Sequence, residues 1–377
     1  MPAVIDATTG SLLIIDGFID KYICLKDDKM KRIAVLGAGG TGHAIAADLT
    51  LAGFEISLYE EPRFKESIDP ILKRGGIEIK GAVRQGFTKL SKVTTNIEEA
   101  LRGAEIILIA ITAWRHESIA ELCAPHLKDG QTIVIGPGNA GSLVFANKLK
   151  EKEIKREVVI AEMHRNFYPC RRTGPAEVTV ALAGGARYIA AFPAKDTSKV
   201  IDCLKGIYDA LPGTNVLEVA LDNPNIMSHV AGSLLNTGAI EKSGGDFYLY
   251  KGYMTPSILR CIEAVYREKM ALFEVLGYTS HSSPDGSKKA HASPEFQNLI
   301  GPTSMQHRYI TEDAATGQAL MVSLGEMLNV PTPVTKALVT LASVINQTDY
   351  LKEGRTVQKL GISNLTIEQL NRYLAEG

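Results

Sequence analysis

Six residues near the start of the chain, Gly37 to Gly42, have the spacing of a loop that binds phosphate. They read Gly-Ala-Gly-Gly-Thr-Gly, with an apolar run before them (Lys31–Leu36) and a helical pattern after them (Thr41–Ala52). Between a strand and a helix, such glycines permit a tight turn, close backbone approach to a pyrophosphate and close packing of the helix. A glycine turn that binds nothing does not require this context. The residues expected to bind a dinucleotide here are Gly37, Gly39, Gly40, Thr41 and Gly42.

An acidic residue about 20 positions further on, at the end of the second strand, should bind the hydroxyls of the adenosine ribose. Glu60 occupies that place, with Glu61 beside it. A carboxylate there favours NAD, because it repels the 2′-phosphate of NADP. Arg63 could instead accept that phosphate, so the sequence predicts NAD and leaves NADP open.

The elements around this loop predict the fold class. Apolar runs alternate with helical patterns, which is typical of βαβ units in a doubly wound parallel sheet of the Rossmann type. Beyond about Asn223 the strand pattern fades, and helices are expected over Thr255–Leu276, Thr316–Leu328 and Thr335–Asn346, with a capping box starting a last helix at Thr366. The further predicted strands are Phe54–Tyr59, Ile106–Ile111, Thr132–Ile135 and Val158–Ala161.

We therefore expect an α/β protein with three parts. Residues 1–30 form an N-terminal extension, 31–219 a dinucleotide-binding domain and 220–377 a mainly α-helical domain that carries substrate and catalytic groups. The polar segment Thr279–Ser293 predicts a mobile surface loop. The glycine-rich stretch 136–141 follows another predicted strand and either lines the ligand crevice or only turns the chain.

Composition excludes several classes of protein. Lys plus Arg (41) nearly balances Asp plus Glu (42), so no basic excess points to nucleic acid. The five cysteines lie far apart and predict neither a disulfide framework nor a metal site. The apolar run Ser11–Asp16 is far shorter than the roughly 20 residues of a membrane span. We expect a cytoplasmic protein without a membrane partner, and a homo-oligomer is possible.

Several stretches beyond the glycine loop resemble one known family. APHLKDGQTIVIGPGNAG (124–141), YPCRRTGPAEV (168–178), LDNPNIMSHVAGSLLNTGAIE (221–241), FYLYKGYMTPS (247–257) and RYITED (308–313) follow one another in that family's order. On these stretches the chain from Met30 onward resembles the opine dehydrogenases, the octopine and nopaline dehydrogenase group. The resemblance implies NAD(P)H-dependent coupling of an amino acid to a 2-oxo acid through an imine.

The resemblance also implies site residues. The family's catalytic histidine falls on His229 and its partner aspartate on Asp313. A histidine suits this chemistry because its unperturbed pKa of about 6.5 lets it donate and accept protons near neutral pH. Asn236 and Thr255 are expected as polar walls. The arginines that could bind substrate carboxylates are Arg165, Arg171, Arg172 and Arg308.

Two departures from the family and two alternatives remain. Val230 stands where the family often has proline, and His164 and Arg165 stand where small polar residues are expected, which points to a different substrate. One alternative is a related reductase such as ketopantoate reductase or glycerol-3-phosphate dehydrogenase, which would use a lysine of the helical domain (Lys242, Lys251 or Lys269). The other is a non-catalytic dinucleotide-binding sensor.

Overall fold

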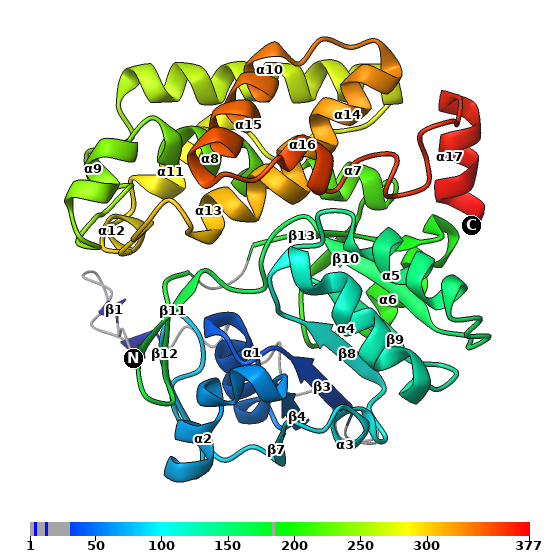
Figure 1. The fold of residues 1–377 in the computed structure, drawn as a ribbon. Helices are drawn as coiled ribbons and strands as arrows, with labels where there is room; N and C mark the ends of the chain where they lie inside the picture. Colours follow the sequence, from blue (N-terminus) through cyan, green and yellow to red (C-terminus); the bar gives the residue numbers. More distant parts are fainter. Residues whose placement is uncertain (1–3, 6–11, 14–30, 183–184) are drawn as a thin grey trace.

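The computed structural model describes residues 4–5, 12–13, 31–182 and 185–377 (Figure 1). The predicted N-terminal extension therefore lies outside the described residues, apart from a short antiparallel pair, β1 (Val4–Ile5) and β2 (Leu12–Leu13). From residue 31 the chain first builds sheets with flanking helices and then a layer of helices above them.

The main sheet has eight strands in the order β14-β13-β10-β9-β8-β3-β4-β7. The six strands from β10 to β7 are parallel, which confirms the predicted doubly wound arrangement. At the other edge β13 runs antiparallel to β10, so the sheet is mixed. Its strands are β3 (Arg32–Leu36), β4 (Glu55–Tyr59), β7 (Lys92–Thr94), β8 (Ile106–Ile109), β9 (Thr132–Ile135), β10 (Val159–Met163), β13 (Arg187–Phe192) and β14 (Ala210–Pro212).

Helices cover both faces of this sheet, as continuously apolar parallel strands require. One apolar core lies under α1 (Gly40–Leu51), α2 (Asp69–Arg74) and α6 (Thr197–Cys203). Another lies under α3 (Ile97–Leu101), α4 (His116–Cys123) and α5 (Gly141–Glu151).

A second, four-stranded sheet in the order β11-β12-β5-β6 packs against α1. Its edge strand β11 brings Cys170–Gly174 to the beginning of α1, where the phosphate-binding loop ends. This sheet thereby adds a wall beside the cofactor site. The other strands are β5 (Ile77–Gly81), β6 (Gly86–Thr88) and β12 (Glu177–Val180).

The remaining helices form a layer above the sheets in Figure 1. Its apolar core runs from α7 to α17 and includes Val230, Phe273 and Leu324. The core also includes Ala140 and Leu143 at the start of α5 and Ala190 of β13. The helices are α7 (Val216–Leu221), α8 (Pro224–Leu234), α9 (Thr237–Lys242), α10 (Pro256–Leu276), α11 (Pro284–His291), α12 (Pro294–Gln297), α13 (Arg308–Thr311), α14 (Ala319–Leu328), α15 (Pro333–Asn346), α16 (Tyr350–Glu353) and α17 (Ile367–Glu376).

We call the portion from β3 to β14 the sheet domain and the portion from α7 to α17 the helical domain. The predicted boundary between residues 219 and 220 falls inside α7, all of whose apolar side chains belong to the helical core. We therefore propose that the boundary lies between β14 and α7. Within the described residues, no helix is long and apolar enough to cross a membrane.

Three helical predictions can be compared directly with the structure. The capping box is confirmed, since Thr366 and Gln369 exchange side-chain and backbone hydrogen bonds at the start of α17. The predicted helix from Thr316 begins as a π-helical segment, Asp313–Gln318, that leads into α14. The prediction of a loop over Thr279–Ser293 is wrong in part, because Pro284–His291 form α11. The residues before α11 bind two buried carboxylates, Glu218 of α7 and Asp222 directly after it.

Candidate active site

A cavity of about 880 Å³ lies between the two domains. On the sheet side it is lined by the residues that follow β3, β4, β8 and β9, at the carboxyl ends of these parallel strands. The chain order reverses between β3 and β8, and α/β folds bind ligands at such a point. On the other side the cavity is lined by α8, α11, α12 and α13 of the helical domain.

The glycine loop forms one end of this cavity. Gly37 has a φ of +107°, and a Cβ there would meet the Ala110 carbonyl oxygen at 2.6 Å. A Cβ at Gly42 would collide with the Gly37 backbone, so both glycines shape the turn without lining the cavity. Gly39, Gly40 and Thr41 do line it, and a Cβ at Gly39 would meet nothing within 4 Å. This open backbone at a helix N-terminus fits a pyrophosphate.

Glu60 faces the same loop from the end of β4. It is buried, and its carboxylate accepts hydrogen bonds from Ala38 N at 2.7 Å and from Arg115 Nη2 at 2.7 Å. Arg115 also binds Glu61 at 2.6 Å, and Arg63 binds Glu61 at 2.9 Å. Two carboxylates therefore stand where a 2′-phosphate would have to bind, and Arg63 is engaged by one of them. Arg115 belongs to no motif, so sequence reasoning missed it.

His229 and Asp313 meet within the helical domain, where His229 comes from α8 and Asp313 from the segment that leads into α14. His229 Nδ1 lies 2.7 Å from Asp313 Oδ2, and both side chains are buried. The ring of Tyr309 stacks on the imidazole with 3.6 Å between centroids. His229 Nε2 makes no hydrogen bond to any described residue, and His229 lines the cavity. The imidazole is thus oriented on one nitrogen and available to a ligand on the other.

The charge state of this pair follows from its surroundings. Burial, reinforced by the positive charges of Arg308 and Arg171, lowers the pKa of His229 well below its usual range. Burial also raises the pKa of Asp313 to about 7, while the charge of Arg308 acts in the opposite direction. Above pH 7 the pair is a neutral imidazole that donates Nδ1–H to a carboxylate, which leaves the Nε2 lone pair for a proton.

All four arginines proposed from the sequence line the cavity. Arg308 forms an ion pair with Glu312, whose carboxylate also accepts Ala113 N of the sheet domain at 2.7 Å. Arg171 donates to the Tyr309 hydroxyl at 3.0 Å, beside His229. The four are Arg165, Arg171, Arg172 and Arg308.

The two predicted polar wall residues lie elsewhere. Asn236 follows α8 and donates to the carbonyl oxygens of Gly232 and Tyr253, and Thr255 is exposed before α10. Neither lines the cavity. Asn236 uses its side chain to bind backbone groups at the end of α8, whereas the Thr255 side chain makes no capping hydrogen bond at the start of α10.

Of the two roles that the sequence left open for the stretch 136–141, the structure supports a place in the wall of the cavity. Gly136 and Pro137 line the cavity. Asn139 binds Thr316 and Asn223 of the helical domain, and Arg355 donates to the Asn139 carbonyl oxygen. The loop thereby joins the two domains next to the site.

Comparisons with known proteins bear on what this cavity does. Residues 212–346 match the family model described as NAD/NADP octopine/nopaline dehydrogenase, alpha-helical domain, and residues 33–162 match the model described as ketopantoate reductase PanE/ApbA. An opine dehydrogenase of Arthrobacter sp. (strain 1C) is 32% identical over 351 residues, which cover 89% of this chain and 96% of that protein. The chain belongs to the opine dehydrogenase family.

More distant relatives agree. The protein ocs of Agrobacterium tumefaciens (strain Ach5) is 23% identical over 91% of this chain and 97% of its own. A solved structure of octopine dehydrogenase with NADH and pyruvate has the same fold, with a TM-score of 0.69 at 15% identity over 92% of this chain and 98% of that one. As a family member, the protein is an NAD(P)-dependent oxidoreductase that acts on the CH–NH group of donors.

The alternatives from the sequence can now be weighed. The likeness to ketopantoate reductases is confined to the sheet domain in the family comparison. None of the three lysines that such a mechanism would need lines the cavity, and Lys269 is buried in an ion pair with Asp222 at 2.6 Å. Family membership as an oxidoreductase removes the non-catalytic sensor.

Proposed function

We propose that this opine dehydrogenase family member couples the amine of an amino acid to the carbonyl of a 2-oxo acid and reduces the resulting imine. The observation that carries the proposal is the His229–Asp313 pair, held at 2.7 Å in the cavity that also contains the glycine loop. NAD(P)H, when bound along Gly39–Thr41, supplies the hydride that reduces the imine carbon.

His229 moves the protons of this reaction. An amino acid at neutral pH carries an ammonium group, which must lose a proton before its nitrogen can attack a carbonyl carbon. The neutral His229 accepts that proton at Nε2, and Asp313 stabilises the imidazolium. The imidazolium then returns the proton to the carbinolamine oxygen, which leaves as water while the nitrogen lone pair forms the C=N bond of a protonated imine. The same residues serve the reverse oxidation.

Arg308 is the proposed anchor for the carboxylate of the 2-oxo acid. It lines the cavity beside His229, and its ion pair with Glu312 holds the guanidinium in place. We expect Arg308→Lys to raise the KM for the 2-oxo acid by about 10-fold or more, because a lysine cannot make the bidentate contact. Initial rates at varied pyruvate measure this, with Arg260→Lys on the exposed face of α10 as control. An unchanged KM would remove Arg308 from carboxylate binding.

Glu60 is the proposed determinant of cofactor choice. We expect Glu60→Gln to lower the ratio of kcat/KM for NADH over NADPH by about 10-fold or more, since it removes a charged acceptor for the ribose and leaves Arg115 with one carboxylate partner. Parallel assays with both cofactors measure the ratio. Glu66→Gln, an exposed change on the same segment, should leave it as in the wild type.

The reaction itself is tested by NADH oxidation with pyruvate in the presence and absence of amino acids. Oxidation that requires the amino acid supports reductive coupling. Oxidation with pyruvate alone would show a hydroxy-acid dehydrogenase instead.

A further inference from the structure

A second group of basic and hydroxyl side chains lines the cavity, contributed by both domains. Its first members follow β10 or lie on β13, and the others come from the segment that begins before α11. The charged groups that act on His164 are Arg165, Asp222 and His281, not those around His229. We call this group the basic arm: His164, Arg165, Arg187, His281, Ser283 and Ser287.

No acidic side chain among the described residues belongs to the basic arm. The carboxylates that line the described cavity are Glu60 and Glu312, and each is paired with an arginine outside the arm. Arg187 is buried, donates to the Phe167 carbonyl oxygen, lies over the Tyr208 ring and forms no ion pair with a described residue. Arg187 therefore gives the arm a positive charge that no lining carboxylate offsets.

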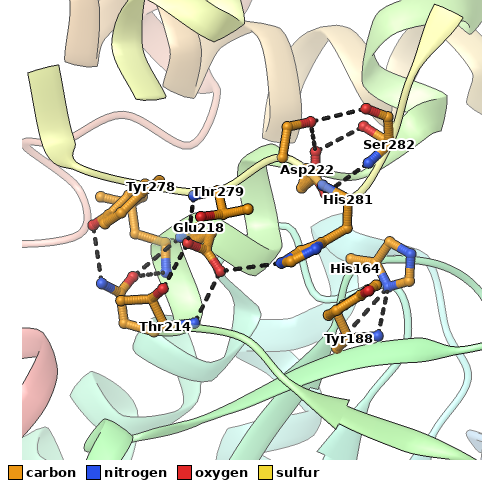
Figure 2. Close-up of polar contacts among 12 residues, drawn as sticks. His164, Tyr188, Thr214, Glu218, Asp222, Tyr278, Thr279, His281 and Ser282 are labelled. Atoms are coloured by element: carbon orange, nitrogen blue, oxygen red, sulfur yellow. Dashed lines mark hydrogen bonds and ion pairs between the residues drawn. The ribbon is translucent and has the colours of Figure 1, made fainter. Parts of the chain in front are cut away.

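Two buried acidic residues, Asp222 and Glu218, lie behind the arm and outside the cavity lining. Asp222 is buried outside the cavity lining and binds Lys269 Nζ at 2.6 Å. It also accepts hydrogen bonds from His281 N and from the backbone and hydroxyl of Ser282 (Figure 2). Lys269 and these donors compensate the charge of Asp222 where it lies. Glu218 Oε1 lies 3.7 Å from His281 Nε2 (Figure 2), so the positive charge of the arm is carried by its arginines and not by His281.

His164 offers a hydrogen-bond donor to the cavity. Its Nδ1 lies 3.1 Å from Tyr188 N and 3.3 Å from Tyr188 O. The Tyr188 carbonyl oxygen already accepts His164 N, whereas Nδ1 is the acceptor for Tyr188 N. The neutral imidazole therefore has its proton on Nε2, which binds no described residue. Burial and, to a smaller extent, the positive charge of Arg165 lower the pKa of His164 to about 4, so its ring is neutral near pH 7.

The arm is also held in a fixed shape. The His281 ring stacks on Tyr188 with 3.4 Å between centroids, and His164 makes an edge contact with the same tyrosine at 5.5 Å. Figure 2 shows the three side chains together. Glu218 accepts Thr279 N at 3.0 Å and fixes the start of the segment. The Ser283 hydroxyl accepts Gly286 N, which leaves its proton free to donate. Donors held in advance bind an anion with little ordering cost.

We propose that the amine substrate is an amino acid with an acidic side chain, and that the basic arm binds its second carboxylate. The inference rests on the proposed coupling reaction. A carboxylate can accept from His164 Nε2 and the serine hydroxyls in the field of the two arginines. A lysine or arginine side chain would meet positive charge in a partly dry cavity and no carboxylate to pair with.

Matched amino acids isolate the charge. Coupling to pyruvate is measured for glutamate against glutamine and for aspartate against asparagine, with norvaline, lysine and arginine alongside. We expect kcat/KM for at least one acid to exceed that of its amide by about 10-fold or more, and the basic amino acids to be poorest. Amides equal to or better than their acids, or a preference for lysine or arginine, would overturn the proposal.

Two variants locate the effect. In His164→Asn the side-chain oxygen can still accept Tyr188 N while the Nε2 donor is lost, and Arg165→Gln removes one charge of the arm. Each should raise the KM for the acidic substrate severalfold more than the KM for norvaline. Equal losses for acidic and neutral substrates would indicate a structural role and count against the proposal. Arg102→Gln, exposed on the sheet domain, is the matched control.

Binding measurements test the charge preference of the basic arm independently of the proposed coupling reaction. Titration calorimetry of the same acid and amide pairs into the NADH-bound enzyme reports the charge preference without turnover. Failure of every amine to support NADH oxidation would sink the coupling reaction. Tighter binding of the acid by about 10-fold would still support the arm, and equal binding of acid and amide would refute it.

Discussion

Replacing His229 with alanine is expected to lower kcat for amine-dependent NADH oxidation by about 10²- to 10⁴-fold, the usual contribution of a general acid–base group. His229 lines the cavity, and its Nδ1 is bound to the buried carboxylate of Asp313. Without this imidazole, Asp313 no longer orients and stabilises a group that accepts the ammonium proton and returns it to the departing oxygen. Stopped-flow or steady-state rates at saturating substrates measure the loss.

Cofactor binding distinguishes a chemical defect from a folding defect in this variant. His229 lies in the helical domain, away from the glycine loop that is expected to bind the pyrophosphate. The Kd for NADH, read from nicotinamide fluorescence, should therefore stay within about twofold of the wild type. His126→Ala, a histidine outside the cavity, should retain full activity. A His229→Ala enzyme with wild-type turnover would remove this residue from the mechanism.

The sequence alone predicted the structural features that are formed by residues close together in the chain. The glycine loop is recognisable because its turn, its open backbone and its helix N-terminus all lie within Gly37–Gly42. The capping box at Thr366 is equally local. His229 and Asp313 are 84 residues apart, so only the family resemblance could pair them before the structure showed their contact.

The features that were missed depend on contacts distant in sequence. In the four-stranded sheet β12 pairs with β5, and Glu177 lies opposite Glu78. The local sequence of a strand does not indicate which distant strand it pairs with. The antiparallel β13 has the same apolar character as its parallel neighbours, so its direction was not predictable. Thr279–Ser293 looks like a loop because it is polar, yet Asp222 and Glu218 bind its polar groups against the helical domain. Arg115 is recognised as a site residue only from its contacts with Glu60 and Glu61 in the folded protein.

The pH dependence of turnover is expected to report the His229–Asp313 pair. Burial raises the pKa of Asp313 to about 7, so its carboxylate gains a proton as the pH falls through that value. A protonated Asp313 donates to His229 Nδ1, which moves the imidazole proton to Nε2 and leaves no base there. If the imidazole takes the proton instead, Nε2 is again protonated. The rate should therefore be full above about pH 8 and fall tenfold per pH unit below about pH 6.

Asp313→Asn tests the assignment because an amide cannot titrate. Its turnover should be lower than that of the wild type by about 10²- to 10⁴-fold at pH 8, since the amide can hold the imidazole in the wrong tautomer. The fall in kcat near pH 7 should vanish in this variant. Titration of the substrate amine affects both enzymes equally, so it cancels when the kcat of the variant is divided by the kcat of the wild type at each pH. Asp285→Asn, exposed at the start of α11, should keep the wild-type profile. If the acid limb persisted in Asp313→Asn, another group would be its source and the pair would not set the protonation state of Nε2.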